Sequence, residues 1–188
     1  MTEQVNPSRP APMFDIRDLL ERSRDSVDLD AVDRQLLQHL YEDSRTSQRS
    51  LAAKVGMSAP AVAERIARLE RAKVIKRHTI EVDWAALGYP MLIVLPITIS
   101  ASADVLAVVT ALQSIPELIE ITVLTGSYDM MARFRVKDHI DLQNLLLERI
   151  WPISGVQRVE TMLSLGQISN SSPLVQFFAA ASDTDRGN

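Results

Sequence analysis

The stretch that decides the first half of the fold is LDAVDRQLLQHLYEDSRTSQRSLAAKVGMSAPAVAERIARLERAKVIKRHTIEVD, residues 29–83. Apolar residues recur in it at helical spacing, which predicts helices over residues 30–42, over residues 48–55 and from residue 59 onward. Ser47 and Ser58 are N-cap candidates for the second and third helices. Gly56 supplies the left-handed backbone that a tight turn between those helices needs. The pattern predicts a helix-turn-helix.

The segment that follows the third helix has the pattern of an extended ribbon. Residues 74–83, VIKRHTIEVD, are rich in β-branched side chains and alternate in polarity, which favours a strand pair. Three short helices followed by such a ribbon predict a winged helix-turn-helix over residues 28–83.

The charge of the chain is distributed unevenly between its parts. The whole chain carries a formal net charge of −4, but residues 44–80 hold nine basic and two acidic side chains, a net charge of +7, which leaves −11 for the remainder. This asymmetry favours a DNA-reading module joined to an acidic second domain. A charged helix face exposed to solvent is the alternative explanation.

A helix-turn-helix inserts its second helix into the major groove, where residues near the N-terminus of that helix meet base edges. Small side chains at this tip allow close approach, and an arginine further along can reach a guanine or a phosphate. The residues expected on this face are Ser58, Ala59, Pro60, Ala61, Arg65 and Arg68. The cations expected at phosphates are Arg45, Arg49, Lys54, Lys76 and Arg77. A helical bundle with a basic surface is the alternative.

The second half of the chain predicts a ferredoxin-like α+β domain. Strands are expected over residues 91–99, 118–125, 130–136 and 156–165, and helices over residues 103–114 and 138–149. Their order is βαββαβ, the split unit of that sandwich. Proline fits poorly inside a central strand, so Pro96 predicts a local break or bulge.

The remaining segments are predicted to be connectors and ends. Residues 1–27 contain three prolines and are expected to form a flexible arm, with Ile16, Leu19 and Leu20 as a possible docking stripe. Residues 84–90 are expected to connect the winged helix-turn-helix to the domain of residues 91–168. Residues 169–188 are expected to form a tail that is disordered beyond about Ala181.

Several classes of site are excluded or disfavoured by the sequence. There is no cysteine, so neither disulfides nor thiolate metal sites are possible. The three histidines His39, His78 and His139 lack metal-ligand spacing. We find no Ser-His-Asp pattern, no P-loop and no dinucleotide fingerprint, so no catalytic residue, metal or cofactor is expected. With neither a signal peptide nor an apolar run long enough to span a bilayer, a cytoplasmic protein is expected.

The same residues resemble the leucine-responsive and asparagine-responsive regulators, the Lrp/AsnC family, over about residues 29–168. The resemblance rests on the quoted stretch and on TGSYDMMARFRV, residues 125–136. The positions that stand where that family's pattern expects them are Asp30, Asp33, Leu37, Leu40, Asp43, Arg45, Ser47, Leu51, Val55, Gly56, Ser58, Val62, Arg65, Ile66, Leu69 and Ile75. Ser50, Gly166 and Gln167 depart from positions where acidic residues are common.

The resemblance implies a transcriptional regulator that binds double-stranded DNA, takes up a small effector such as an amino acid, and assembles as a dimer that associates further into tetramers or octamers. The implied effector residues are Thr125, Gly126, Tyr128 and Asp129, with Met162 and Ser164 nearby. Asp129 could pair with an ammonium group, and turn amides near Gly126 could hold a carboxylate. A sirohaem decarboxylase-like enzyme on the same fold and an effector-independent nucleoid-organising protein are the competing hypotheses.

Overall fold

The computed structural model describes residues 26–170 and 173–184, which form two compact units. Residues 83–167 make up one unit, and the residues up to Val82 together with those from Ile168 onward make up the other. The expected N-terminal arm, with Ile16, Leu19 and Leu20, lies almost entirely outside the described residues.

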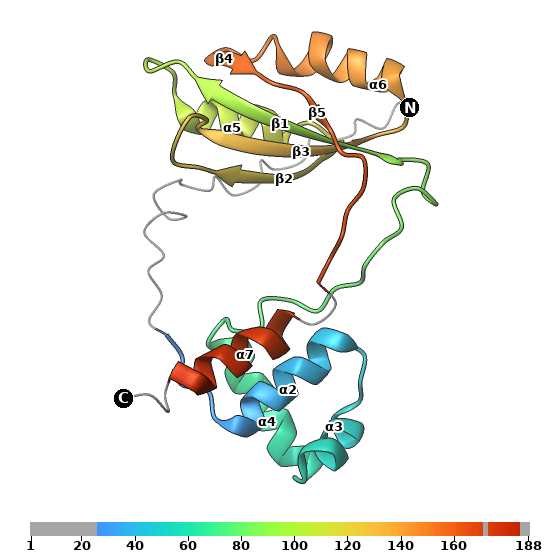
Figure 1. The fold of residues 1–188 in the computed structure, drawn as a ribbon, viewed down its shortest axis with the longest axis vertical. Coiled ribbons are helices and arrows are strands. Elements are labelled where there is room, and N and C mark those ends of the chain that lie inside the picture. Colours follow the sequence, from blue (N-terminus) through green and yellow to red (C-terminus); the bar gives the residue numbers. More distant parts are fainter. Residues whose placement is uncertain (1–25, 171–172, 185–188) are drawn as a thin grey trace, which may run out of the picture. The chain divides into compact units, whose positions relative to one another are not determined.

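The first unit along the chain is built on the three expected helices, α2 (Ala31–Glu42), α3 (Gln48–Val55) and α4 (Ala59–Arg71) (Figure 1). Their apolar faces converge on one small core, since burying one stripe of each amphipathic helix removes it from water. The buried residues of this core are Leu36, Leu51, Ala52, Val62 and Ile66. The helix-turn-helix predicted from the sequence is therefore present.

The predicted ribbon of the wing differs from the structure. Residues 76–83 are exposed and contain no strand, and within the described part of the chain they pair with none. A side chain holds this segment instead, because the Ser44 hydroxyl donates to the Thr79 carbonyl at 3.2 Å. A strand requires a ladder partner, and alternation in the sequence does not supply one.

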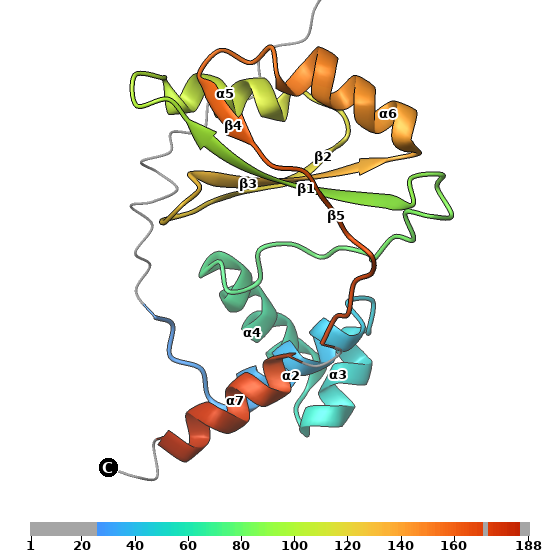
Figure 2. The same cartoon turned by 45° about the horizontal axis from the view of Figure 1, so that its top comes forward.

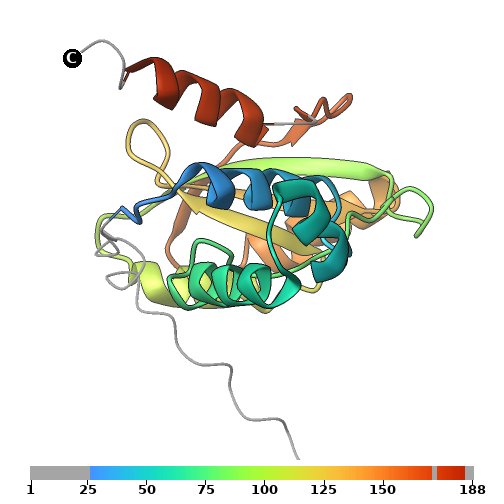
Figure 3. The ribbon, with the colours of Figure 1, turned by 90° about the horizontal axis from the view of Figure 1, so that it is seen from below.

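The C-terminal segment also differs from its prediction. Residues Pro173–Thr184 form a helix, α7, which extends past the point where disorder was expected. It lies beside α2, on the side away from α4 (Figure 3), and belongs to the same unit as the helix-turn-helix. Leu174 and Phe178 are half-buried on it, whereas Phe177 is 73% exposed. The helix-turn-helix unit is therefore built from two separate parts of the chain, the residues up to Val82 and the later helix α7.

The other unit is an antiparallel sheet with helices on one face (Figure 2), in the predicted βαββαβ order. Its elements are β1 (Met91–Ile99), α5 (Val105–Gln113), β2 (Leu118–Val123), β3 (Met130–Val136), α6 (His139–Asn144), η1 (Leu145–Ile150), β4 (Val156–Val159) and β5 (Met162–Leu163). The strands are ordered β2-β3-β1-β4, and β5 also pairs with β1. Val108 and Leu112 of α5 and Ile150 of η1 pack on the inward sheet residues.

The break expected at Pro96 occurs on only one edge of β1: the pairing with β4 covers Ile97–Ile99 and that with β5 covers Ile93 and Val94, and Pro96 falls between them. Pro96 pairs with Met131 in an unbroken register between β1 and β3. Its carbonyl accepts from the Glu160 amide at 3.0 Å, so its backbone edge faces the link between β4 and β5. The missing proline N–H therefore falls where the ladder is already interrupted. The irregularity of β1 lies at Thr98 and Ile99, where the register with β4 shifts.

The predicted last strand and last helix are each divided in the structure. The strand expected over residues 156–165 is interrupted at Glu160 and Thr161, between β4 and β5. The helix continues from α6 into η1 with π-type bonding, in which the Trp151 amide donates to the Leu146 carbonyl at 2.9 Å. In the described ranges no helix combines the length and apolarity that crossing a bilayer requires.

Candidate functional site

The tip of α4 is formed as the sequence predicts. The Ser58 hydroxyl accepts a bond from the Ala61 amide at 3.4 Å and caps the helix, and Pro60 lies in the first turn. Gly56 ends α3 with φ of 68°, in the left-handed region. Ser58 and Pro60 are exposed, whereas Ala59 packs against the core. The tip presents small side chains to solvent.

A group of exposed cations lies in the helix-turn-helix unit: Arg45, Arg49, Lys54, Lys76 and Arg77. The Arg45 side chain is 88% exposed and its nearest carboxylate oxygen, on Asp43, is 3.9 Å away. The other four make no ion pair within the described part of the chain. Exposed cations without a protein partner are able to neutralise phosphates.

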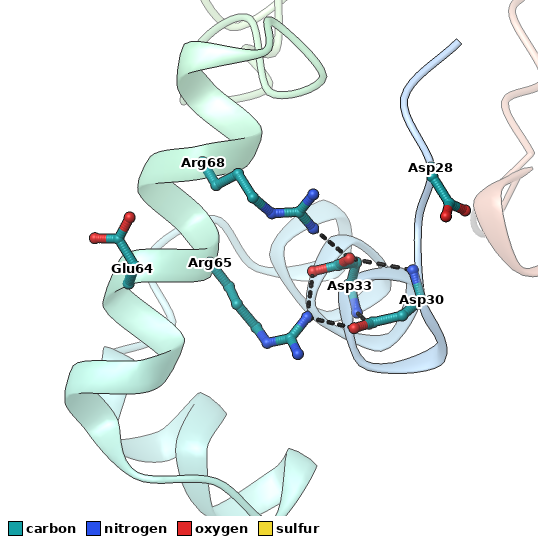
Figure 4. A pocket seen from close by; sticks show the side chains of 6 residues that line it. All are labelled: Asp28, Asp30, Asp33, Glu64, Arg65 and Arg68. Carbon is teal, nitrogen blue, oxygen red and sulfur yellow. Dashed lines mark hydrogen bonds and ion pairs between the residues drawn. The ribbon is translucent and has the colours of Figure 1, made fainter.

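Arg65 and Arg68 differ from this group, because their guanidinium groups face α2 (Figure 4). Arg65 Nη1 lies 2.6 Å from Asp30 Oδ2 and 2.9 Å from Asp33 Oδ1. Arg68 Nη2 bonds to Asp33 Oδ2. The sequence reasoning expected both arginines on the DNA-facing surface, and in the structure they link α4 to the first turn of α2.

The charges of this cluster stabilise one another. Asp33 is 1% exposed, so its carboxylate is tolerated in the interior only with bonded partners. The Asp33 amide and the Arg65 guanidinium donate to Asp30, which lowers the pKa of the Asp30 carboxyl. In return, hydrogen bonds to Asp30 and Asp33 raise the pKa of Arg65. The four residues of the cluster line a pocket together with Asp28 and Glu64 (Figure 4).

Asp33 is the residue of this cluster that sequence reasoning gave no role. Asp33 lies three, four and seven residues before Leu36, Leu37 and Leu40, on the apolar stripe of α2. A carboxylate on such a stripe signals a buried partner, because an unpaired charge would be too costly there. Arg65 and Arg68, three residues apart on α4, are the cations that this signal would have pointed to as partners of Asp33.

The β2–β3 turn contains four of the predicted effector residues: Thr125, Gly126, Tyr128 and Asp129. Gly126 has φ of 128°, and both Thr125 and Gly126 are exposed. Asp129 Oδ2 accepts from the Ile99 amide at 2.8 Å, and the Asp129 amide donates to the Ile97 carbonyl at 3.0 Å. One carboxylate oxygen of Asp129 is thus used to fix the turn against β1.

The other two predicted effector residues lie elsewhere on the sheet. Met162 pairs with Val94, and the Ser164 amide donates to Leu92 at 3.0 Å. Leu92 is seven residues from Ile99, roughly 23 Å along an extended strand. Within one chain the structure therefore does not bring Ser164 to the β2–β3 turn. The side chain that does reach Tyr128 is Glu160, whose hydrogen bond raises the pKa of the Tyr128 phenol.

Comparison with known proteins gives consistent matches to both units. Residues 29–70 match the model of the AsnC-type helix-turn-helix domain, and residues 93–174 match that of the Lrp/AsnC ligand binding domain. The HTH-type transcriptional regulator FL11 of Pyrococcus horikoshii is 33% identical over 74% of this chain and 91% of its own.

Solved structures resemble the chain over a similar extent. The structure of AsnC from Escherichia coli has a TM-score of 0.72 and 26% identity, covering 77% of this chain and 97% of that one. A transcriptional regulator of Neisseria meningitidis, solved as a complex with L-Met, has a TM-score of 0.74 and 22% identity over 80% of this chain and 99% of its own.

Proposed function

Because this chain belongs to the Lrp/AsnC family of DNA-binding transcriptional regulators, we propose that it reads DNA with the tip of α4, binds an amino acid at the β2–β3 turn and acts as a homo-oligomer. The observation that supports the first part most directly is the coincidence, in one unit, of a capped helix tip of small residues with exposed cations that make no ion pair to the described residues: Arg49, Lys54, Lys76 and Arg77. The tip residues would meet base edges, and Arg49, Lys76 and Arg77 would meet phosphates.

The DNA-binding assignment is tested by the salt dependence of affinity for the fragment upstream of the chain's own gene. Each cation that neutralises a phosphate contributes about 0.9 to the slope of log K against log salt. Arg49→Gln and Lys76→Gln are each expected to lower the slope by that amount. The control is Lys137→Gln in the sheet unit, which should leave it unchanged. Absence of binding by the unaltered protein at low salt would refute the proposal.

The same titration separates a specific regulator from a nucleoid-organising protein. A regulator binds its own site about 10³-fold or more tightly than random DNA at physiological salt. Equal affinity for the upstream fragment and for random DNA of the same length would favour the nucleoid-organising alternative.

The effector proposal rests on the chemistry of the β2–β3 turn. Asp129 uses Oδ2 to accept the Ile99 amide, and Oδ1 makes no hydrogen bond to the described residues, so it could accept an α-ammonium group. Amides of the turn around Gly126 could receive the α-carboxylate. A related fold that binds L-Met, in the Neisseria meningitidis regulator, supports an amino acid as the class of ligand.

A thermal-shift screen against the standard amino acids tests this site, because a ligand that binds the native state alone raises the melting temperature. Asp129→Asn keeps an oxygen for the Ile99 amide while it removes the charge, and should abolish the shift. Asp138→Asn is the matched control, since Asp138 also accepts backbone amides, those of Ile140 and Asp141. A shift that persists in Asp129→Asn would place the ligand elsewhere.

We propose that the chain is a regulator and not a sirohaem decarboxylase-like enzyme. Catalysis on a tetrapyrrole would call for histidine and arginine groups in the sheet unit, and His139, exposed at the start of α6, is the one histidine of residues 83–167. Titration with sirohaem should produce no protein-bound Soret band, and a saturable band with loss of carboxylates would support the enzyme.

A further inference from the structure

A charge cluster joins the recognition helix α4 to the first turn of α2. We propose that Asp33 is a positioning residue for DNA recognition: it holds Arg65 and Arg68 and thereby fixes α4, while these two arginines stay out of the set that contacts DNA. The inference rests on the proposed DNA-reading function and names residues of that same site that act without touching the nucleic acid.

The first argument is that Asp33 is fully used inside the protein. Its Oδ1 accepts from Arg65 at 2.9 Å, and its Oδ2 accepts from Arg68 and from the Asp30 amide, the latter at 3.2 Å. The residue is 1% exposed. Withdrawing either arginine to a phosphate would leave a buried carboxylate short of partners, which is strongly unfavourable.

The second argument is the contrast between the arginines and the other cations of the unit. The Arg65 side chain is 28% exposed and bonds to two carboxylates, and the Arg68 side chain is 42% exposed and bonds to one. Arg49 and Lys76 are exposed and make no ion pair in the described ranges. A cation whose charge is already balanced by a carboxylate neutralises little phosphate charge, so the DNA releases few counterions to it. Arg65 and Arg68 therefore contribute to the placing of α4 and little to phosphate affinity.

The third argument is that the cluster continues into the N-cap of α2. Asp30 accepts from the Asp33 amide at 2.8 Å and from Arg65 at 2.6 Å, while Asp33 accepts from the Asp30 amide. The capping box that begins α2 is thus part of the same network as α4. Because the network joins two rigid helices, it determines the angle at which the α4 tip leaves the unit.

The experiment measures affinity of the full chain for its specific site and for random DNA over a range of salt concentrations. In Asp33→Asn the specific affinity should fall toward the non-specific level, by about tenfold or more, the equivalent of one lost base contact. In the double variant Arg65→Gln/Arg68→Gln the ratio of specific to non-specific affinity should also fall. The slope of log K against log salt should stay as in the unaltered protein. The control pair Arg49→Gln/Lys76→Gln should lower the slope by about 1.8.

Three results would overturn the inference. A slope lowered by about 1.8 in the arginine pair would make Arg65 and Arg68 phosphate contacts. A ratio of specific to non-specific affinity that is unchanged in Asp33→Asn would mean that Asp33 does not position α4, and an increased ratio would mean that arginines released from the carboxylate bind DNA themselves. Failure of the unaltered protein to bind DNA is a distinct outcome, which refutes the proposed function.

A variant with both charges retained keeps the test valid if Asp33→Asn does not fold. Arg65→Lys/Arg68→Lys preserves the positive charge that a phosphate needs but loses the planar fork that bridges the carboxylates. If Asp33 positions α4 through the arginines, this variant should have a lower ratio of specific to non-specific affinity and an unchanged salt slope. Circular dichroism at the assay temperature verifies that the variant is folded. An unchanged ratio would contradict the inference.

Discussion

At the scale of single residues, Asp30 has two functions in one side chain. It caps α2 by accepting from the Asp33 amide, and it pairs with Arg65 across to α4. Its exposure of 50% means that solvent screens the ion pair, so the contribution of the pair to stability is modest. Because both bonds favour the charged carboxylate, the pKa of Asp30 is lowered from its ordinary value of 3.8.

The lowered pKa of Asp30 predicts a pH-dependent contribution to stability. The contribution is present above pH 3.8, the pKa in the unfolded chain, and is lost as pH falls through the lower pKa of the folded state. Asp30→Asn retains a capping oxygen but not the charge. The difference in unfolding free energy between the two proteins should therefore be constant above about pH 5 and shrink as the solution becomes more acidic.

Urea unfolding at several pH values measures this difference. Asp104→Asn is the matched control, because Asp104 caps α5 through its side chain without an arginine partner among the described residues. A difference for Asp30→Asn that does not change between pH 6 and pH 3 would contradict the assigned cause (these pH values bracket the ordinary carboxyl range).

At the scale of elements, the turn between α3 and α4 depends on one backbone conformation. Gly56 has φ of 68°, and a methyl group added to it would meet no atom within 4 Å. The cost of Gly56→Ala is therefore one of backbone strain alone, about 1–2 kcal/mol. Gly166→Ala is the control, since Gly166 has equal space without a positive φ.

Denaturant unfolding of both glycine variants measures this cost. Gly56→Ala should be less stable than the unaltered protein by that amount, and Gly166→Ala should lie close to it. Equal midpoints for the two variants would show that the left-handed turn is not required.

The C-terminal helix allows a second test at this scale, because two adjacent phenylalanines of α7 differ in burial. Phe178 is half-buried and Phe177 is 73% exposed. Removing Phe178 deletes apolar surface that is partly withdrawn from water, which costs about 1 kcal/mol. Phe178→Ala should accelerate amide exchange in α2, beside which α7 lies, whereas Phe177→Ala should not. Equal exchange in α2 for both variants would contradict the packing of α7.

At the scale of the whole molecule, the sheet unit covers one face with helices and leaves the other without them (Figure 2). The register places a strip of apolar residues on that second face, the half-buried Val94 and Met131 and the buried Pro96, next to Met162, which is 46% exposed. Arg133, which pairs with Val94, borders this strip. An apolar strip of this kind is typical of a surface for a second copy of the chain. This strip supports the proposed homo-oligomer.

Met131→Asp tests the oligomer by placing a charge in the middle of the strip. The unaltered protein should sediment as a dimer or larger, and the variant should sediment as a monomer, because a buried unpaired carboxylate at an interface is costly. Leu147→Asp on η1, 55% exposed, is the control and should keep the oligomer. A monomeric unaltered protein, or an oligomeric Met131→Asp variant, would contradict the proposal.

The local patterns of the chain determined most of its elements by themselves. The caps Ser47 and Ser58 and the glycine at position 56 act within a few residues, so the starts of α3 and α4 and the turn between them could be predicted. The βαββαβ order followed in the same way from periodicity, including β1 and β3 to the residue.

Only the tertiary structure decided what depends on partners distant in sequence. Residues 76–83 alternate like a strand but have no ladder in the described part of the chain, and Pro96 stays in β1 because its edge meets the interruption between β4 and β5. The sequence predicts Arg65 as a DNA contact, whereas in the structure its guanidinium group bonds to Asp33, 32 residues away. The physical reason is that a buried charge is stable only beside a bonded partner of opposite charge. Which residues are buried together is decided by the folded molecule and not by neighbours in the sequence.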